Sequence, residues 1–235
     1  MSKKKIIAII PARGGSKGVP GKNLKELAGL PLIDHTILFA IDSRVFDKII
    51  ISSDDDKICS RADKYNVEAI KRPSHLAEDN SLVIDAIKYT IDVLSNNGYY
   101  PDYVFLLEPT SPLRDNAELL NAVNALNNGY DSVASFCETT TPPSRVWLIN
   151  NNRIKPLLED TNPFLPRQKQ IVGYRLTGQY YGFRTSLVRE ENQILTMDDR
   201  FYPLITSPEK AVDIDREVDF IIAEQMIKYL RKPKI

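Results

Sequence analysis

Short apolar runs alternate with helix-like segments along the first 136 residues of the chain. Five runs have the length and composition of buried strands: residues 6–10, 48–53, 67–70, 103–107 and 132–136. Between them, apolar residues recur at helical spacing, as in Leu32, Ile33, Ile37 and Ile41. This repeated alternation predicts a parallel α/β sheet covered by helices on both faces. The polar loops that follow the strands should meet at one edge of the sheet, where α/β proteins bind ligands.

The pattern changes after residue 138. A turn cluster at 139–143 precedes a predicted β-hairpin at 146–155, and the polar stretch 156–171 contains three prolines and has no helical period. We interpret residues 139–172 as an inserted arm, of the kind that serves as a lid or an oligomer contact. Further strands are predicted at 179–183, 201–205 and 211–215, followed by a helix at about 216–230.

Composition limits the classes of protein that fit. The 235 residues suit one α/β domain, and 43% apolar with 26% charged residues is ordinary for a globular protein. Lysine plus arginine (31) equals aspartate plus glutamate (31), which argues against a general nucleic-acid binder. No apolar run is as long as a signal-peptide core or a membrane span, so we expect no membrane association and a cytoplasmic protein.

Basic residues and glycines are concentrated directly after the first strand. The twelve residues 12–23 hold four glycines, one arginine and two lysines. Glycines let backbone N–H groups approach a bulky anion, and the cations neutralise it. The spacing fits neither the P-loop nor the dinucleotide motif, and a surface turn remains an alternative. We interpret this loop as a cradle for a nucleoside triphosphate.

Two acidic clusters are candidate metal ligands. Asp54, Asp55 and Asp56 follow the second strand at the start of a helix, where capping is favoured over metal binding. Asp213 and Asp215 alternate along a predicted strand, which would place both carboxylates on one face. Such hard oxygen ligands suit Mg²⁺. For Asp215, capping of the last helix is an alternative that is compatible with metal binding.

Several motifs now carry a resemblance to a known family. They are Ile10–Lys17 with Pro20, Lys22 and Asn23; Arg72 and Pro73 with Leu76, Ala77 and Asp79; Pro109–Arg114; Asp213–Asp215 with Asp219; and, more weakly, Pro166–Gln168 with Gly178 and Tyr181. With these motifs in order from residue 6 to about 220, the chain resembles the acylneuraminate cytidylyltransferases. The resemblance implies a Rossmann-like, three-layer nucleotidyltransferase fold with a mostly parallel sheet. It also implies one domain over residues 1–235, with 139–172 as the arm of a homodimer.

The resemblance implies a reaction and a set of site residues. The family transfers CMP from CTP to a nine-carbon α-keto acid sugar, giving a CMP-sugar and pyrophosphate with Mg²⁺. Arg13 and Lys17 would hold the β- and γ-phosphates and Lys22 the α-phosphate, while Asp213 and Asp215 would bind the metal. The other nucleotide-binding residues implied are Ala12, Gly14, Gly15, Ser16, Asn23, Arg72 and Ser81. The sugar-binding residues implied are Glu108, Thr110, Ser111, Arg167, Gln168, Thr177, Gln179 and Tyr181.

The sequence departs from the sialic-acid-specific members at two of these positions. Those members tend to have glutamine where Glu108 stands and asparagine where Thr177 stands. An ionised carboxylate only accepts hydrogen bonds. We therefore hypothesise that the sugar is a relative of N-acetylneuraminic acid, such as legionaminic or pseudaminic acid. For Arg167, a role at the dimer contact is an alternative to binding the sugar carboxylate.

Two other functions are alternatives to this one. CMP-Kdo synthetases share the fold but tend to have Arg-x-x-Ser-x-Arg in the opening loop, where this chain has Arg13–Lys17. A non-catalytic nucleotide-binding relative is disfavoured because Lys22, Asp213 and Asp215 are all present.

Overall fold

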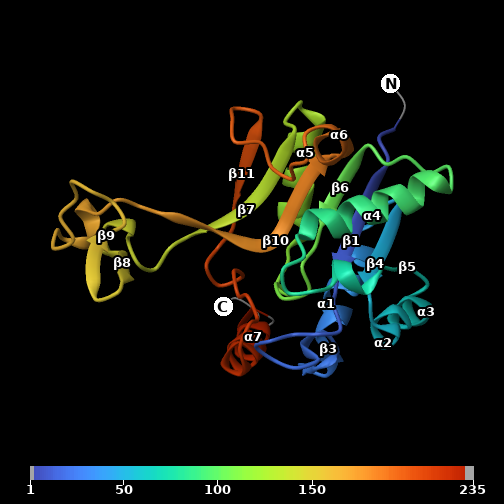
Figure 1. Cartoon of the computed structure of the whole chain (residues 1–235), viewed down its shortest axis with the longest axis horizontal. Coiled ribbons are helices and arrows are strands. Elements are labelled where there is room, and N and C mark those ends of the chain that lie inside the picture. The colour runs from blue at the N-terminus through green and yellow to red at the C-terminus, as the bar shows by residue number, and fades with distance from the viewer. Residues whose placement is uncertain (1–2, 231–235) are drawn as a thin grey trace.

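A seven-stranded sheet forms the centre of the molecule (Figure 1). The computed structural model describes residues 3–230; residues 1–2 and 231–235 lie outside the described residues. The strand order is β11-β7-β10-β6-β1-β4-β5. The bounds are β1 Ile6–Pro11, β4 Lys48–Ser53, β5 Glu68–Lys71, β6 Tyr103–Leu106, β7 Ser132–Glu138, β10 Tyr174–Arg184 and β11 Phe201–Ile205. All of these strands run parallel except β10, which is antiparallel to both neighbours, so the mostly parallel sheet is confirmed.

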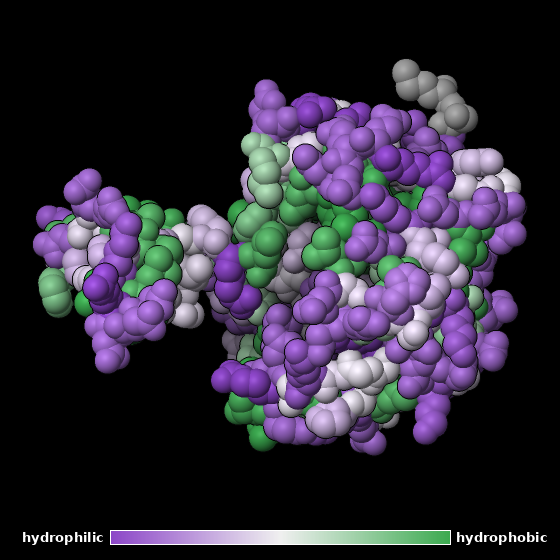
Figure 2. Space-filling view, in the orientation of Figure 1, coloured by the Kyte–Doolittle hydropathy of each residue, from purple (hydrophilic) through white to green (hydrophobic). Residues whose placement is uncertain are grey.

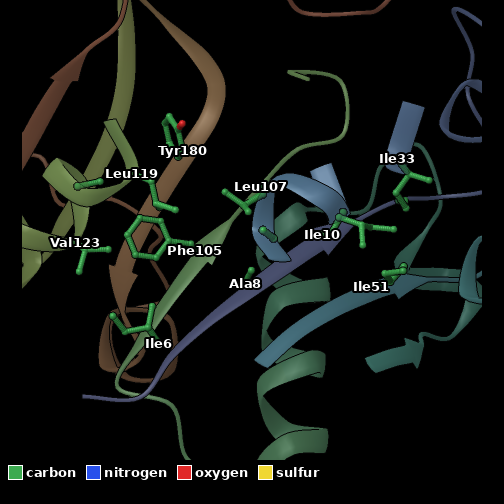
Figure 3. Close-up of a cluster of buried hydrophobic side chains, with 14 of the residues drawn as sticks. Ile6, Ala8, Ile10, Ile33, Ile51, Phe105, Leu107, Leu119, Val123 and Tyr180 are labelled. Atoms are coloured by element: carbon green, nitrogen blue, oxygen red, sulfur yellow. The ribbon is translucent and has the colours of Figure 1, made fainter. Parts of the chain in front are cut away.

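Helices cover both faces of this sheet, which gives the expected three layers. On one face lie α1 Leu32–Ser43, α2 Asp56–Cys59, α3 Arg61–Tyr65 and α5 Asn116–Asn127; on the other lie α4 Val83–Asn96 and α6 Thr185–Glu190. The central strand β1 shows why: Ile6, Ala8 and Ile10 pack into the first core, and Ile7 and Ile9 into the second. Figure 3 shows the first core, with Phe105 and Leu107 of the neighbouring strand segment beside β1.

A third apolar cluster lies beyond the sheet, next to the candidate site. Helix α7 (Glu217–Leu230) contributes Phe220, Ala223 and Ile227, which pack with Val19 and Ile214. The small strands β2 (Glu26–Leu27) and β3 (Leu30–Pro31) pair beside it. This packing joins the glycine-rich loop to the C-terminal part of the chain.

Three local predictions differ from the structure. The helix expected through residues 58–65 is two short helices, α2 and α3, separated at Ser60. Residues 211–215 do not form the predicted strand, because the Ile214 N–H bonds to the loop carbonyl of Thr110 at 2.9 Å and not to a neighbouring strand. Helix α6 was not predicted from the sequence.

The segment 139–172 projects from the body of the molecule (Figure 1). The Thr139 N–H donates to the Gly173 carbonyl at 2.8 Å, so β7 and β10 stay paired at the base of the arm. The predicted hairpin is present as β8 (Trp147–Asn150) and β9 (Arg153–Pro156). Figure 2 shows the arm as a separate lobe that exposes apolar residues, including Trp147, Ile149 and Phe164. Within residues 3–230, no helix has the length and apolar content needed to cross a bilayer.

Candidate active site

The loops that follow β1, β4, β5 and β6 meet at one edge of the sheet, as expected. Backbone hydrogen bonds connect the first three: Ala12 donates to the Ser52 carbonyl at 3.0 Å, and Arg72 donates to the Ser53 carbonyl at 2.8 Å. A cavity of about 390 Å³ opens there. It is lined by Pro11, Arg13, Ser16, Lys17, Gly18, Lys22, Asn23, Glu108, Pro109, Thr110, Asp213 and Asp215.

Internal contacts hold the glycine-rich loop in shape. The Asn23 side chain is buried and donates from Nδ2 to the Arg13 carbonyl at 3.0 Å, which closes the loop. The Gly14 N–H donates to Asp54 Oδ1 at 3.1 Å. Gly18 lies against the Asp215 carbonyl so closely that an added Cβ would overlap it. The loop therefore depends on Gly18 for its contact with residues 213–215.

Three cations of this loop are paired with carboxylates. Arg13 and Lys17 both contact Asp79, at 2.9 Å and 2.8 Å. The largely buried Lys22 donates to Asp215 Oδ1 at 3.0 Å and to the Ile214 carbonyl at 2.9 Å. A bound polyphosphate would compete with Asp79 and Asp215 for these cations, because it offers the same kind of anionic oxygen.

Asp213 and Asp215 line the same cavity as Arg13. The pKa of Asp213 is raised, mainly because its carboxylate is partly desolvated in the cavity, and also by the charge of Asp215. Residues 3–230 contain no cluster of three or more His, Cys, Asp or Glu side chains placed to hold a metal ion. Protein ligation of a metal here would thus come from this aspartate pair.

Arg72 lies in an adjoining cavity of about 300 Å³, which also has Arg13, Asp79 and Ser81 in its wall. Arg72 is 6% exposed, and its Nε has no hydrogen-bond partner among the described residues. Burial lowers the pKa of its guanidinium. The Ser81 hydroxyl donates to the His75 carbonyl at 2.6 Å. A buried donor without a partner is costly, so Arg72 is suited to bind an acceptor on a ligand.

Six of the eight residues implied as sugar ligands lie in or next to the main cavity, in two groups. Glu108 and Thr110 line the main cavity, and Tyr181 is half-buried on β10. The second group is buried and engaged in protein hydrogen bonds: Ser111 to the Thr177 carbonyl at 2.7 Å, and Gln179 to the Lys210 carbonyl at 3.0 Å. These bonds show a structural role for that group, and a contact with the sugar stays a prediction.

Other predicted site residues lie outside the main cavity. Arg167 and Gln168 are exposed on the projecting arm, in a short turn at Arg167–Lys169. Ala12 is buried behind the loop, and Gly15 lines a third, more open cavity next to Asp79.

The acidic triplet after β4 has the capping role that the sequence favoured. The Asp55 side chain accepts from the N–H groups of Lys57 and Ile58 and so caps α2. The Asp54 carboxylate accepts the hydrogen bond from the Gly14 N–H, and Asp56 forms an ion pair with Lys71.

Sequence reasoning missed the part played by Asp79. The sequence patterns assign it no contact, yet its carboxylate contacts two of the three cations. Its position in the Leu76-Ala77-x-Asp79 motif was the available signal.

Comparisons with known proteins identify the family of this chain. A family model described as "Cytidylyltransferase" matches residues 7–231. The CMP-N,N'-diacetyllegionaminic acid synthase of Legionella pneumophila is 32% identical over 95% of this chain and 97% of its own length. The N-acylneuraminate cytidylyltransferase of Escherichia coli is 30% identical over 98% of this chain, which spans about half (54%) of that protein.

A solved structure supports the fold. A CMP:2-keto-3-deoxy-manno-octonic acid synthetase in complex with CTP superposes with a TM-score of 0.68, covering 97% of this chain and all of that chain at 15% identity. At this identity the likeness concerns the fold alone. The family model and the 32% identical relative together show that the chain belongs to the cytidylyltransferase family and, within it, to the acylneuraminate cytidylyltransferases.

Proposed function

We propose that this protein transfers CMP from CTP to the anomeric hydroxyl of a nonulosonic acid and releases pyrophosphate. The observation that carries the proposal is the composition of the main cavity. Arg13, Lys17 and Lys22 line it together with Asp213, Asp215 and Glu108. This arrangement suits a triphosphate with a divalent cation next to a second, polar substrate.

The chain's own residues would act mainly by positioning and charge. The sugar hydroxyl loses its proton as its oxygen bonds to the α-phosphorus, and the bond from that phosphorus to pyrophosphate breaks. Negative charge grows on the α-phosphoryl oxygens and on the leaving group. Lys22 is suited to stabilise the charge on the α-phosphoryl oxygens because it is largely buried. Arg13 and Lys17 are suited to stabilise the charge on the leaving pyrophosphate.

Asp213 and Asp215 fit a Mg²⁺ ion. Mg²⁺ is usually held by one or two carboxylates together with water and substrate phosphates, which matches a pair of aspartates in a cavity that three cations also line. When bound, Mg²⁺ would neutralise phosphate charge. Asp215 also pairs with Lys22 through Oδ1, so binding of the cation by this carboxylate would weaken that pair and favour a contact of Lys22 with the α-phosphate.

Glu108 supports a sugar with amide donors. No described residue donates a hydrogen bond to its carboxylate, although Arg114 binds its main-chain carbonyl at 2.6 Å. The sugar named for the Legionella relative carries two N-acetyl groups and hence two amide N–H donors. An acceptor carboxylate suits such a donor. We therefore propose a diacetylated nonulosonic acid of the legionaminic or pseudaminic type as the preferred substrate.

We also propose a cytoplasmic homodimer formed through the arm. An isolated two-stranded hairpin is marginally stable in water, and this one exposes Trp147, Leu148, Ile149 and Ile154. A second copy would cover these side chains. Because Arg167 lies on the arm and away from its own cavity, any contact with the sugar carboxylate would be made in the partner's site.

The test is pyrophosphate release with CTP and Mg²⁺ over a panel of sugars. The panel holds N-acetylneuraminic, N,N'-diacetyllegionaminic, pseudaminic and 2-keto-3-deoxy-manno-octonic acids. We expect the highest kcat/KM with a diacetylated acid. A clear preference for N-acetylneuraminic acid would overturn the sugar assignment, and turnover of only the eight-carbon acid would overturn the substrate class.

A further inference from the structure

Strand β10 contains an irregularity next to Glu108, which lines the main cavity. Its pairing register with β7 shifts between Leu176 and Tyr181, so the intervening residues bulge out of the ladder. Gly178 has a φ of +71° within this bulge. Such a conformation is open to glycine and strained for other residues.

Buried hydrogen bonds hold the bulge on both sides of Gly178. Thr177 Oγ1 donates to Ser135 Oγ at 2.7 Å, and the Thr177 carbonyl accepts from Ser111 Oγ at 2.7 Å. On the other side, the Gln179 amide donates to the carbonyls of Leu113 and Lys210. The position of Gly178 is therefore fixed by the fold.

The bare Cα of Gly178 faces the Glu108 carboxylate. A Cβ built on Gly178 would overlap Glu108 Oε2 and lie 2.8 Å from Ser111 Oγ. The Glu108 main chain cannot easily move away, because its carbonyl is bound by the half-buried Arg114. The Glu108 carboxylate therefore occupies the position that a side chain at residue 178 would take.

We propose that Gly178 is a specificity-determining positioning residue that sets where the Glu108 carboxylate meets the acceptor sugar. This inference rests on the proposed function, and in particular on Glu108 as a sugar contact. Gly178 itself touches no substrate in this scheme. It acts through Glu108, and a displaced carboxylate would no longer align with the donor group of the sugar.

The decisive experiment compares Gly178→Ala with Gly98→Ala. Gly98 has a similar φ of +75° but nothing within 4 Å of an added Cβ, and it lies after α4, at the far end of the sheet. Both variants carry the same backbone strain, and only one displaces Glu108. We expect Gly178→Ala to raise KM for the sugar at least ~10-fold, the scale of a misplaced substrate contact. KM for CTP should stay within about two-fold, and Gly98→Ala should leave both constants unchanged.

A rescue variant separates positioning from general damage. Aspartate is one methylene shorter than glutamate and leaves room for the added Cβ. The double variant Gly178→Ala/Glu108→Asp should therefore be no weaker toward the sugar than Glu108→Asp alone. Additive losses, an equal rise in KM for CTP, or an equal effect of Gly98→Ala would overturn the proposal.

Thermal unfolding keeps the proposal testable if Gly178→Ala is too unstable to assay. The loss in Tm caused by Gly178→Ala should be smaller in the Glu108→Ala background, where the overlapping carboxylate is absent. An equal loss in both backgrounds would refute the contact. A wild-type protein without activity on any nonulosonic acid would instead refute the proposed function, and the Tm comparison would still test the contact.

Discussion

The Asp79 carboxylate accepts a hydrogen bond from the Arg13 guanidinium at 2.9 Å, and the same carboxylate lies 2.8 Å from Lys17 Nζ. The hydrogen bonds from Lys17 and then Arg13 lower the pKa of Asp79, so it is ionised at neutral pH. The Asp79 carboxylate thus lies between two cations, in a position where a phosphate group could make the same ion pairs. The loop holds its cations in position before any nucleotide arrives.

Removing the charge of Asp79 should strengthen nucleotide binding. In Asp79→Asn, CTP no longer competes with a carboxylate for Arg13 and Lys17, so we expect KM for CTP to fall about two- to ten-fold at low salt, the scale of exposed ion pairs. The difference should shrink at high salt because of screening. Steady-state kinetics at two ionic strengths measures this, with the exposed Asp63→Asn as a control. A higher KM would mean that Asp79 supports the site and does not compete for it.

Lys22 should matter for turnover more than for binding. Lys22→Ala removes the largely buried cation of the cavity, and we expect kcat to fall at least ~10²-fold, the scale of losing one transition-state charge contact. Lys25→Ala is the matched control, because Lys25 lies three residues farther along the chain and pairs with Glu217 outside the cavity. Near-normal kcat in Lys22→Ala would remove Lys22 from this role.

Glu108 should make stability depend on pH. Burial, and next the charge of Asp213, raise the pKa of Glu108 to about 7 from an ordinary value of 4.5. Between these values the folded protein holds a proton that the unfolded chain has released, so the free energy of unfolding falls as pH rises. The slope is at most ~1.4 kcal/mol per pH unit, and it levels off above about pH 7.

The check is the difference in Tm between wild type and Glu108→Gln, measured across that pH range without metal. We expect the glutamine variant to gain relative stability as pH rises, since its amide does not ionise. A difference that stays constant with pH would show that Glu108 titrates normally.

Gly18 should be needed for the contact between the glycine-rich loop and residues 213–215. In Gly18→Ala the new Cβ would overlap the Asp215 carbonyl, a backbone atom that cannot rotate away. We expect a Tm several degrees lower, equivalent to about 1–3 kcal/mol for an overpacked site. Gly15→Ala is the control, because nothing lies within 4 Å of its added Cβ and its Tm should be kept. Equal Tm values for the two variants would contradict the close contact.

The arm should control the oligomeric state. Phe164→Asp places a charge on the apolar surface of the arm, which a second copy is proposed to cover, and we expect the dimer to dissociate. Met197→Asp is a matched control on the body, because both side chains are 89% exposed. Light scattering coupled to size exclusion gives the mass of each. A wild-type monomer, or dissociation by both variants, would refute the arm as the interface.

Much of the fold could be predicted from residue pattern because the core is layered. The alternation of Ile6–Ile10 between two apolar cores produces an uninterrupted apolar run, which is the expected signal of a central strand. The strands at 48–53 and 201–205 have the bounds that their composition indicates. The apolar pattern within each of these segments determines its structure, so the sequence alone was enough to predict these strands.

The remaining differences come from contacts between distant segments. Asp213 and Asp215 lie in a strand-like sequence, but Ile214 is bound by Thr110, over a hundred residues earlier. The polar side chains of Thr177 and Gln179 gave no sign that they would be buried, because their partners Ser135 and Lys210 come from other elements. Periodicity also could not show that β10 runs antiparallel or that it bulges at Gly178.

Strand β10 belongs to the arm, the site and the sheet at once. It begins at the base of the arm, passes Glu108 at its bulge and ends between β6 and β7. The ladder with β7 is interrupted only between Leu176 and Tyr181, so the break lies between the arm and the part of β10 that pairs at the centre of the sheet. A displacement of the arm would therefore act along β10 on the residues next to Glu108, which gives contacts made by the arm a direct covalent route to the cavity wall.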